Sequence, residues 1–477
     1  DDPTVVAGLV RAEDAWGHVS EQRLSIWDFL ERDTAAKRCS ITSEVAAALP
    51  FDFWGGYVGY LGYGLKAECG GEPSCPASDM PDAALFLADR VVVFDHKMDD
   101  VYVVAIANSA CRSSAEEWMH STAARLHSLS SSTTDRLPEA EEERPLQRYF
   151  QPQPVATSAV PDEHGYSNQF NGKPKVAPVV VRSNGTAPLS KGARAAVVQM
   201  RARHSRKQYM QNVRECLQAL HDGESYELCL TTTFTGTAVR SAWDCYQILR
   251  RINPAPYGAW LSFGDGGPEV CCSSPERFLR GGRGRTLEAK PIKGTAKRSP
   301  DPTEDAALAA ELQASEKNRA ENLMIVDLLR NDLGRVCDPG SVHVPALIAL
   351  ESFATVHQLV STVRGRRRAD ATAVQAIRAA FPGGSMTGAP KLRSMQILDR
   401  LEGGPRGVYS GCIGFIGLND TFDLNIVIRT AVFSGGRVTI GAGGAVVIAS
   451  TPEEEYEEMH LKAAPLLHAV GATVLDA

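Results

Sequence analysis

The sequence predicts an α+β fold in which two large antiparallel β-sheets form a sandwich with helices on the outside. Strand-like and helix-like segments come in groups along the chain, without the strict alternation of a parallel α/β fold. The 477 residues are enough for a large buried core, and a content of 43% hydrophobic and 22% charged residues is typical of a globular protein.

Residues 1–125 are predicted to form an N-terminal β-rich segment of this fold. The runs 83–95 and 101–107 are rich in apolar and β-branched residues, as strands are. Residues 53–66 read FWGGYVGYLGYGLK, and their glycines and aromatic residues suit close packing of neighbouring backbones.

Residues 126–203 are predicted to be a low-complexity linker or insertion. They are rich in Ser, Thr, Pro, Glu and Gly and show little hydrophobic periodicity. Such a segment buries too little apolar surface to offset the entropy lost on ordering, so we expect it to be disordered.

Residues 204–477 are predicted to be the C-terminal catalytic region. The first helix, 207–223, has helical spacing of its apolar residues and ends at a glycine. Strands are expected at 225–236, 257–264, 269–280, 409–418, 422–435 and 437–450, and helices at 303–332, 372–381, 391–402 and 452–470.

Composition excludes several classes of protein. The net charge of −7 with interspersed signs offers no electrostatic basis for binding nucleic acid. No apolar run reaches the roughly 18 residues of a membrane span, so we expect no membrane partner. The eleven cysteines include no C-x-x-C pair and there is no secretory signal, which argues for reduced intracellular thiols and against zinc. The chain begins without Met, so we expect an excised piece that lacks its targeting information.

Lys293 is the first candidate for chemistry, in the sequence PIKGT. One interpretation is a solvated lysine beside a turn. The other is a nucleophilic amine, which requires a pKa lowered by burial or by neighbouring cations. The five residues alone leave both interpretations open.

Carboxylates on two predicted helices are candidates for a metal site. Glu321 shares a helix face with apolar residues, where a carboxylate is costly unless it is paired or bound to a metal. Glu455, Glu458 and Lys462 line one stripe of the last helix, which is also the arrangement of an ordinary solvated ion pair. If they face Glu321 across a cleft, the carboxylates make a site for Mg²⁺.

Two loops and one arginine are candidates for binding an anion. Residues 381–391, FPGGSMTGAPK, precede a helix and can present backbone N–H groups, but the spacing is not that of a nucleotide-binding P-loop. Residues 440–447, IGAGGAVV, also allow close backbone approach. Arg429 interrupts an apolar strand and requires an anionic ligand or an internal salt bridge. Together these features favour an enzyme that acts on a small polyanion.

Several motifs in this order resemble the chorismate-utilising enzymes. They are PIKGT, AENLMIVDLLRNDLGR, PGGSMTGAPK, YSGCIG and DLNIVIRT, and the resemblance is dense over 207–470 and looser over 51–107. GESYELCLTT, CCSSPERFL and LPFDFWGGYVGYLGYGLKAECG are most similar to the aminodeoxychorismate-forming branch of plants and related eukaryotes. In that branch the synthase half follows a glutamine amidotransferase half, and this chain is similar to the synthase half alone.

The resemblance implies a fold like that of anthranilate synthase component I and an activity. Chorismate plus ammonia, supplied from glutamine by an amidotransferase domain or subunit, gives 4-amino-4-deoxychorismate for 4-aminobenzoate and folate synthesis, a transaminase-class reaction. Lys293 corresponds to the family's nucleophile, which attacks C2 of chorismate as the C4 hydroxyl leaves. Glu276, in SSPERF, corresponds to the general acid/base.

The resemblance also implies a cofactor and a set of substrate contacts. Glu321 and Glu458 match ligands of Mg²⁺, with Glu455 nearby. The groups around the substrate's carboxylates are matched by Ser385, Tyr409, Arg429, Gly443, Gly444 and Lys462.

Two departures from the family pattern bear on the choice of branch. Gln358 stands where anthranilate synthases have the histidine that serves pyruvate elimination, and strand alternation is expected to point His357 to the other face. The motif of a tryptophan pocket is not recognisable at residues 25–29. The alternatives are an anthranilate synthase component I, against which Lys293 and Gln358 speak, and a catalytically inactive chorismate-binding or regulatory subunit. We expect a soluble protein, in the plastid of a photosynthetic eukaryote and otherwise in the cytoplasm.

Overall fold

The computed structural model describes residues 8–13, 18–38, 49–74, 76, 78–131, 198–264, 266–353 and 356–475. The described residues fall into two compact units. The first unit draws on Asp1–Ala88, Arg194–Glu351 and His357–Ala477, and the second on Asp89–Ala193 and Ser352–Val356. Most of the predicted linker, residues 132–197, lies outside the described part of the chain.

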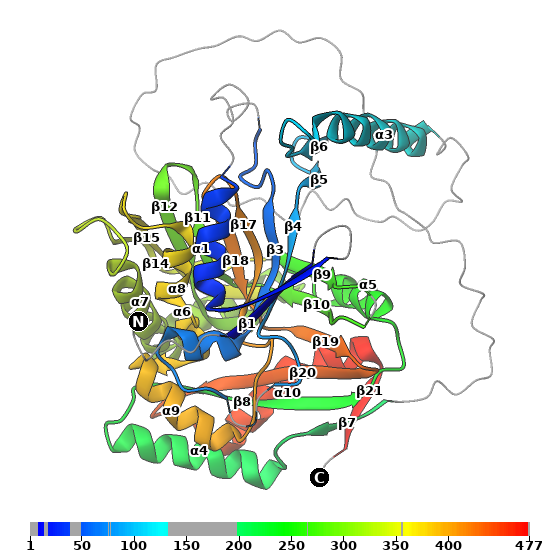
Figure 1. Cartoon of the computed structure of the whole chain (residues 1–477). Coiled ribbons are helices and arrows are strands. Elements are labelled where there is room, and N and C mark those ends of the chain that lie inside the picture. The colour runs from blue at the N-terminus through cyan, green and yellow to red at the C-terminus, as the bar shows by residue number, and fades with distance from the viewer. Residues whose placement is uncertain are drawn as a thin grey trace, which may run out of the picture. The chain divides into compact units, whose positions relative to one another are not determined.

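The first unit contains a nine-stranded sheet (Figure 1). The pairings from β15 to β4 are antiparallel. In spatial order the strands are β13 (Ile292–Lys297), β15 (Val356–Arg366), β12 (Thr286–Lys290), β11 (Arg277–Gly281), β18 (Phe422–Ile426), β17 (Cys412–Gly417), β3 (Gly56–Leu61) and β4 (Ala83–Ala88), with β14 (His343–Ser352) beside β15.

An eight-stranded sheet forms the second layer. Its pairings are antiparallel except that of β21 with β7. In spatial order the strands are β21 (Ala472–Leu475), β7 (Val198–Ala202), β8 (Glu227–Thr237), β20 (Arg437–Val446), β19 (Thr430–Ser434), β10 (Glu269–Ser274) and β9 (Tyr257–Ser262), with β16 (Gly388–Ala389) beside β8.

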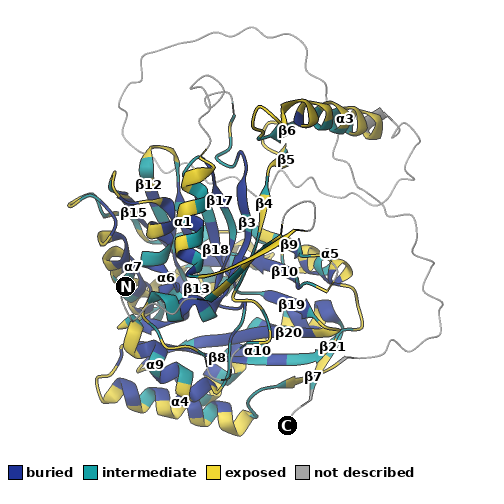
Figure 2. Ribbon diagram, in the orientation of Figure 1, coloured by how far each residue is buried: buried dark blue, intermediate teal, exposed yellow. Residues whose placement is uncertain are grey.

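Buried apolar side chains join the two layers. A cluster that includes Tyr60, Ile413, Val270 and Val432 connects β3 and β17 of one sheet with β10 and β19 of the other. The helices of the first unit cover the sheets with their buried faces inward and their exposed faces outward (Figure 2). The predicted α+β sandwich with outer helices is therefore confirmed.

Each sheet has its own set of helices, and each set shares a hydrophobic core with its sheet. The eight-stranded sheet packs with α4 (Arg206–His221), α5 (Ala242–Ile252), α9 (Lys391–Glu402) and α10 (Pro452–Val470). The core of the nine-stranded sheet includes residues of α1 (Ile26–Ala36), α7 (Glu316–Gly334) and α8 (Ala373–Ala380), and α6 (Pro302–Ala314) lies against β13.

Several predicted elements differ in detail. The run 83–95, expected as one strand, is two strands, β4 and β5 (Arg90–Asp95), that belong to different sheets. The helix expected over 303–332 is interrupted at Ser315, whose side chain accepts a hydrogen bond from Asn318 N and so caps α7. Among the described helices, none is long and apolar enough to cross a membrane.

The remaining elements are two hairpins, a long helix and short helical turns. β1 (Gly8–Glu13) pairs with β2 (Val19–Leu24), and β5 pairs with β6 (Asp100–Ala105). The linker was predicted to span residues 126–203, but both of its ends are ordered. α3 spans Arg112–Ser131 and so includes the first residues of that range, and β7 (Val198–Ala202) includes the last ones. The short turns are η1 (Tyr63–Cys69), η4 (Arg283–Arg285) and η5 (Gly384–Met386).

Candidate active site

Lys293 and Glu227 form a buried ion pair between the two sheets. Lys293 lies on β13 and Glu227 begins β8, and the Nζ–Oε1 distance is 2.5 Å. Glu227 is 0% exposed and Lys293 is 9% exposed. The other oxygen of Glu227, Oε2, is buried and has no hydrogen-bond partner in the structure. Lys293 is therefore a buried cation, and the interpretation of a solvated surface lysine is wrong.

The electrostatic surroundings of Lys293 differ from those expected of a free amine. Burial alone would lower the pKa of Lys293, but the carboxylates of Glu227 and Glu321 outweigh this effect and raise it. The nucleophile hypothesis required a lowered pKa for Lys293, and the structure does not show one. The sequence did not indicate that Glu227 would be a neighbour. At rest Lys293 is an ammonium, and it becomes nucleophilic once a base takes its proton.

Glu276 is a buried carboxyl group between β10 and β11. Burial raises its pKa to about 7, although a hydrogen bond with Ser385 and the charges of Lys293 and Lys462 oppose this shift. The backbone holds Glu276 firmly, since its carbonyl accepts from Ile426 N at 3.0 Å. A carboxyl group with this pKa is suited to give up a proton near neutral pH.

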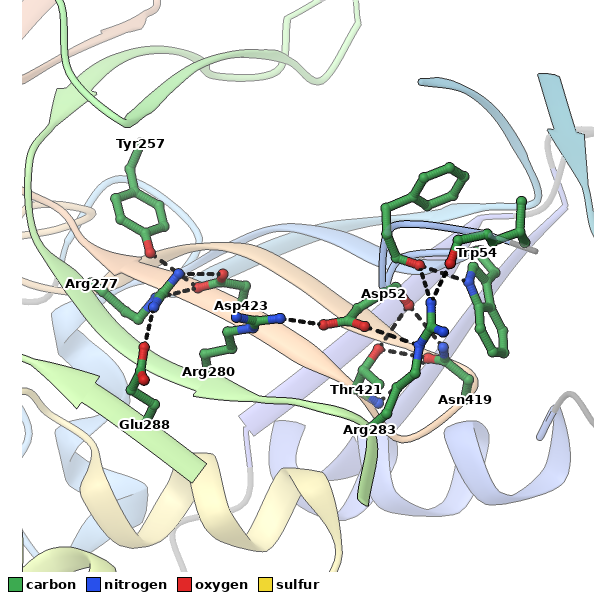
Figure 3. A network of polar contacts seen from close by, with 12 residues as sticks. Asp52, Trp54, Tyr257, Arg277, Arg280, Arg283, Glu288, Asn419, Thr421 and Asp423 are labelled. Atoms are coloured by element: carbon green, nitrogen blue, oxygen red, sulfur yellow. Dashed lines mark hydrogen bonds and ion pairs between the residues drawn. The ribbon is translucent and has the colours of Figure 1, made fainter. Parts of the chain in front are cut away.

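Arg277, which follows Glu276 and begins β11, forms ion pairs with the two neighbouring strands (Figure 3). Arg277 donates from Nε and Nη2 to the two oxygens of Asp423, at 3.2 and 3.1 Å, and also pairs with Glu288. Its guanidinium lies 5.7 Å from the ring centre of Tyr257. These contacts fix β11 between β18 and β12, and with it the backbone that presents Glu276.

Glu321 points from α7 toward Lys293. It is buried, and its Oε2 lies 3.8 Å from Lys293 Nζ. Burial raises the pKa of Glu321 to about 7, while Lys293 lowers it in part. Glu321 therefore belongs to the same cluster of buried charged groups as Lys293 and Glu227.

The N-terminal part of α10 contributes two further carboxylates. Thr451 caps the helix, Pro452 occupies its first turn, and Glu455 follows in that turn, where the helix dipole favours an anion. Glu455 Oε1 accepts from Ser450 Oγ at 2.6 Å, and its buried Oε2 has no hydrogen-bond partner in the structure. Burial raises the pKa of Glu455.

Glu458 and Lys462 form the ion pair that the helix spacing predicted. The Nζ–Oε1 distance is 2.6 Å, and Lys462 also donates to Gly443 O at 3.1 Å. Burial opposes ionisation of Glu458, but Lys462 outweighs it and lowers the pKa. Gly444 is required beside these carboxylates, since a Cβ there would lie 2.7 Å from Glu455 Oε2.

Arg429 occupies a bend, where the sequence predicted the interior of a strand. β18 ends at Ile426 and β19 begins at Thr430, and Arg429 between them has a φ of 51°, a costly conformation for a non-glycine residue. Within the described residues its guanidinium makes no hydrogen bond or ion pair, so the internal salt bridge is not observed. Burial lowers the pKa of Arg429. Arg429 is partly buried, and such a cation without a partner is suited to receive an anionic ligand.

Tyr409 and the glycine-rich strand complete the candidate site. The Tyr409 ring packs directly on Gly441, where a Cβ would lie 2.2 Å from Cγ of the ring. A Cβ at Gly443, two residues along β20, would lie 2.2 Å from Leu230 O, so the close approach of β20 to β8 at this point requires glycine. Burial raises the pKa of Tyr409, and the positive charge of Arg429 opposes this shift.

His357 and Gln358 contact different elements, as strand alternation predicted for consecutive residues. His357 Nε2 lies 3.0 Å from Asp305 Oδ1 on α6. Gln358 Nε2 donates to Thr295 Oγ1 at 3.4 Å, two residues from Lys293 on β13. The imidazole is thus engaged by a carboxylate of α6.

Sequence reasoning missed three residues around the site. They are Glu227, Lys317, whose Nζ lies 3.5 Å from Glu455 Oε1, and Arg406, which is described below. For Glu227 a signal was present, because a glutamate opening the apolar strand ELCL is costly to bury unless it has a partner.

The three candidate metal ligands do not by themselves form a complete metal-binding site. Within the described ranges, no group of three or more His, Cys, Asp or Glu side chains could by itself hold a metal ion. Glu321, Glu455 and Glu458 nevertheless supply the oxygen atoms that a hard cation prefers. The unpaired Oε2 of Glu455 is a buried acceptor that a cation would satisfy.

Comparisons with known proteins agree with this geometry. The family described as chorismate binding enzyme matches residues 7–468. The chain is 45% identical to "Probable aminodeoxychorismate synthase, chloroplastic" of Oryza sativa subsp. japonica, over 96% of this chain and 48% of that protein. It is 44% identical to "Aminodeoxychorismate synthase" of Streptomyces griseus, over 96% of this chain and 55% of that protein. The chain thus spans about half the length of these relatives.

A solved structure shares the fold over nearly the whole chain. It is anthranilate synthase component I from Streptococcus pneumoniae, with a TM-score of 0.70 and 26% sequence identity. The match covers 97% of this chain and 90% of that one.

Proposed function

Because the chain belongs to the family of chorismate-binding enzymes, we propose that it is the synthase part of an aminodeoxychorismate synthase. The reaction replaces the C4 hydroxyl of chorismate with an amino group from ammonia and gives 4-amino-4-deoxychorismate. The observation that carries the proposal is the buried Lys293–Glu227 pair, whose charges act on the nearby protonatable Glu276. The names of the relatives at 44–45% identity support it.

Substrate binding rests on cations and backbone groups. Chorismate carries two carboxylates, and Arg429 offers an unpaired guanidinium to one of them. Tyr409, Ser385 and the backbone at Gly443 and Gly444 surround this region. Lys462, next to Gly443, offers a second cation.

The first chemical step forms a bond between Lys293 Nζ and C2 of chorismate. Glu227, 2.5 Å away, takes a proton from the Lys293 ammonium, and the free amine attacks C2. Both conjugated double bonds of the ring shift and the C4–O bond breaks. Glu276 gives its proton to the departing hydroxyl, which leaves as water.

The second step exchanges the lysine for ammonia. Ammonia attacks C4, both double bonds shift back, and the C2–N bond to Lys293 breaks. Glu227 returns its proton to Lys293, and Glu276 takes one from the new ammonium group at C4. Both carboxylates and the lysine are thereby restored, and the net change is the loss of water and gain of the amine.

Glu321, Glu458 and Glu455 are the residues that we propose to hold Mg²⁺. These carboxylates would hold the ion, which would supply positive charge to neutralise the ring carboxylate of the substrate. The unpaired Oε2 of Glu455 and the buried Glu321 support this assignment.

We also propose a source for the ammonia. Since the chain spans about half of its relatives' length, a glutamine amidotransferase domain or subunit accounts for the other half and supplies ammonia from glutamine. The product serves 4-aminobenzoate and folate synthesis. The chloroplastic relative favours a plastid location.

The test is to identify the product formed from chorismate, Mg²⁺ and an ammonium salt by chromatography. We expect 4-amino-4-deoxychorismate. Anthranilate as the main product would assign the chain to the anthranilate-forming branch, and no turnover by folded protein would favour an inactive binding subunit.

A further inference from the structure

Arg406 and Glu402 form a second buried ion pair behind the candidate site. Glu402 is the last residue of α9, and Arg406 follows four residues later. Both side chains are almost completely buried. Arg406 donates from Nε to Glu402 Oε2 at 2.8 Å and from Nη2 to Glu402 Oε1 at 2.6 Å, which is the bidentate arrangement of a strong pair.

The same guanidinium ties together three separate chain segments. Nη1 donates to Met386 O at 2.6 Å and to Ser410 Oγ at 3.2 Å, and Nη2 donates to Cys229 O at 2.9 Å. Glu402 Oε1 extends the network, since it accepts from both N and Oγ1 of Thr231 at 2.9 Å.

Two of these segments carry a group assigned above to the substrate, and the third, β8, pairs with the strand that carries another. Met386 follows Ser385, and Ser410 follows Tyr409. Cys229 and Thr231 lie on β8, downstream of Glu227, and Thr231 pairs across the sheet with Gly443 of β20. The groups therefore come from parts of the chain far apart in sequence, and Arg406 contacts their immediate neighbours.

We propose that Arg406, held by Glu402, is a positioning residue that fixes Ser385, Tyr409 and the β8–β20 backbone at the distances needed to bind chorismate. This inference rests on the proposed function, because it takes those groups to be substrate contacts. Arginine is suited to the role, since its planar guanidinium has five donors in a fixed geometry. Lysine has three donors on one nitrogen and cannot reach all five acceptor atoms.

A matched control lies in the same core. Lys66 is 0% exposed and pairs with Asp399, which is also on α9. Both cations lie against the Tyr63 ring, Arg406 at 4.3 Å and Lys66 at 5.5 Å from its centre. Within the described residues, the Lys66 ammonium forms its ion pair with Asp399 and donates to none of the three segments that Arg406 joins.

The test compares Arg406→Lys with Lys66→Met in the chain that carries the amidotransferase or in this chain with an ammonium salt. The melting temperature, the KM for chorismate, kcat and direct binding of chorismate are measured for each. We expect Arg406→Lys to raise KM and the chorismate dissociation constant at least about tenfold, with a smaller change in kcat, because the fastened groups bind substrate. Lys66→Met should lower the melting temperature and leave KM within about twofold.

A second variant guards against loss of folding. Arg406→Met combined with Glu402→Gln removes both charges, so no buried ion is left unpaired, and such replacements are often tolerated. This variant should fold and show the same rise in KM. The proposal is overturned if either Arg406 variant folds and binds chorismate as wild type does, or if Lys66→Met raises KM equally.

Failure of the proposed function has a different signature. Wild-type protein that binds chorismate but forms no 4-amino-4-deoxychorismate refutes the activity, while the binding comparison still decides the role of Arg406. Wild-type protein that binds no chorismate overturns both.

Discussion

Lys293 Nζ and Glu227 Oε1, 2.5 Å apart and shielded from solvent, connect β13 of one sheet with β8 of the other. The same pair that is assigned the first proton transfer is therefore also a structural link between the two layers. Substitutions at either residue are expected to affect stability and activity separately.

Lys293→Ala should abolish amination with ammonia from glutamine, with kcat falling by about a thousandfold or more, as for other covalent nucleophiles. It should also destabilise the fold by roughly 3–5 kcal/mol, because it leaves the Glu227 carboxylate buried without a partner. Lys293→Met with Glu227→Gln should regain most of that stability and remain inactive. Activity and chemical denaturation, measured on the same samples, check both parts; a folded Lys293→Ala protein with near-normal turnover contradicts the nucleophile.

Glu276→Gln should stabilise the protein and inactivate it. The folded-state pKa of Glu276, about 7, lies above the ordinary value of 4.5, so its ionisation opposes folding. That cost is absent below about pH 4.5, grows as pH rises to about 7, and reaches on the order of 3 kcal/mol. The variant should therefore exceed wild type in unfolding free energy at pH 8 and match it near pH 4.5.

The activity of wild type should fall on the alkaline side of about pH 7, since the general acid loses its proton there. Glu276→Gln should lower kcat about a hundredfold or more. A pH profile of kcat/KM and denaturation at the two pH values test the assignment. If the variant and wild type have equal unfolding free energies at both pH values, Glu276 has an ordinary pKa and the assignment is wrong.

Glu321→Gln and Glu458→Gln should each raise the Mg²⁺ concentration needed for activity, by about tenfold or more. Each change removes an anionic oxygen from a cation that prefers such ligands. The exposed Glu457 on the same helix supplies the control, and Glu457→Gln should leave the Mg²⁺ titration unchanged. If the Mg²⁺ titration curves of Glu321→Gln and Glu458→Gln coincide with those of Glu457→Gln and wild type, the metal site is refuted.

Wild-type protein should release 4-amino-4-deoxychorismate without anthranilate, and without 4-aminobenzoate unless a separate lyase is added. Elimination of pyruvate requires a base, and the amide of Gln358 cannot take a proton at neutral pH. His357, the adjacent imidazole, is engaged by Asp305. Gln358→His should therefore introduce a trace of lyase activity, detected as 4-aminobenzoate by chromatography.

Local patterns were enough to predict the fold class and the helices that carry candidate residues. Glu321, Glu455 and Glu458 lie on α7 and α10, and the sequence predicted both ends of α10 and the C-terminal end of α7 within a few residues, although it missed the break at Ser315. The ion pair of Glu458 with Lys462 followed from helical spacing in the same way.

Interactions across the sandwich could not be predicted by the same means. The partner of Lys293 is 66 residues away in sequence, and no local pattern links a strand of one sheet to a strand of the other. The bend at Arg429 was also missed, because its apolar neighbours read as one continuous strand. Contacts that depend on tertiary packing, including those of Arg406, became visible only with the fold.

The place of β3 in the nine-stranded sheet has a consequence for biosynthesis. β3 pairs with β17, which the ribosome makes about 350 residues later. At translation rates of roughly 5–20 residues per second, the apolar strand GYVGYL waits on the order of 20–70 seconds for that neighbour. During this interval the edge of β3 that β17 will cover has no partner strand, and an unpaired strand edge is prone to aggregation.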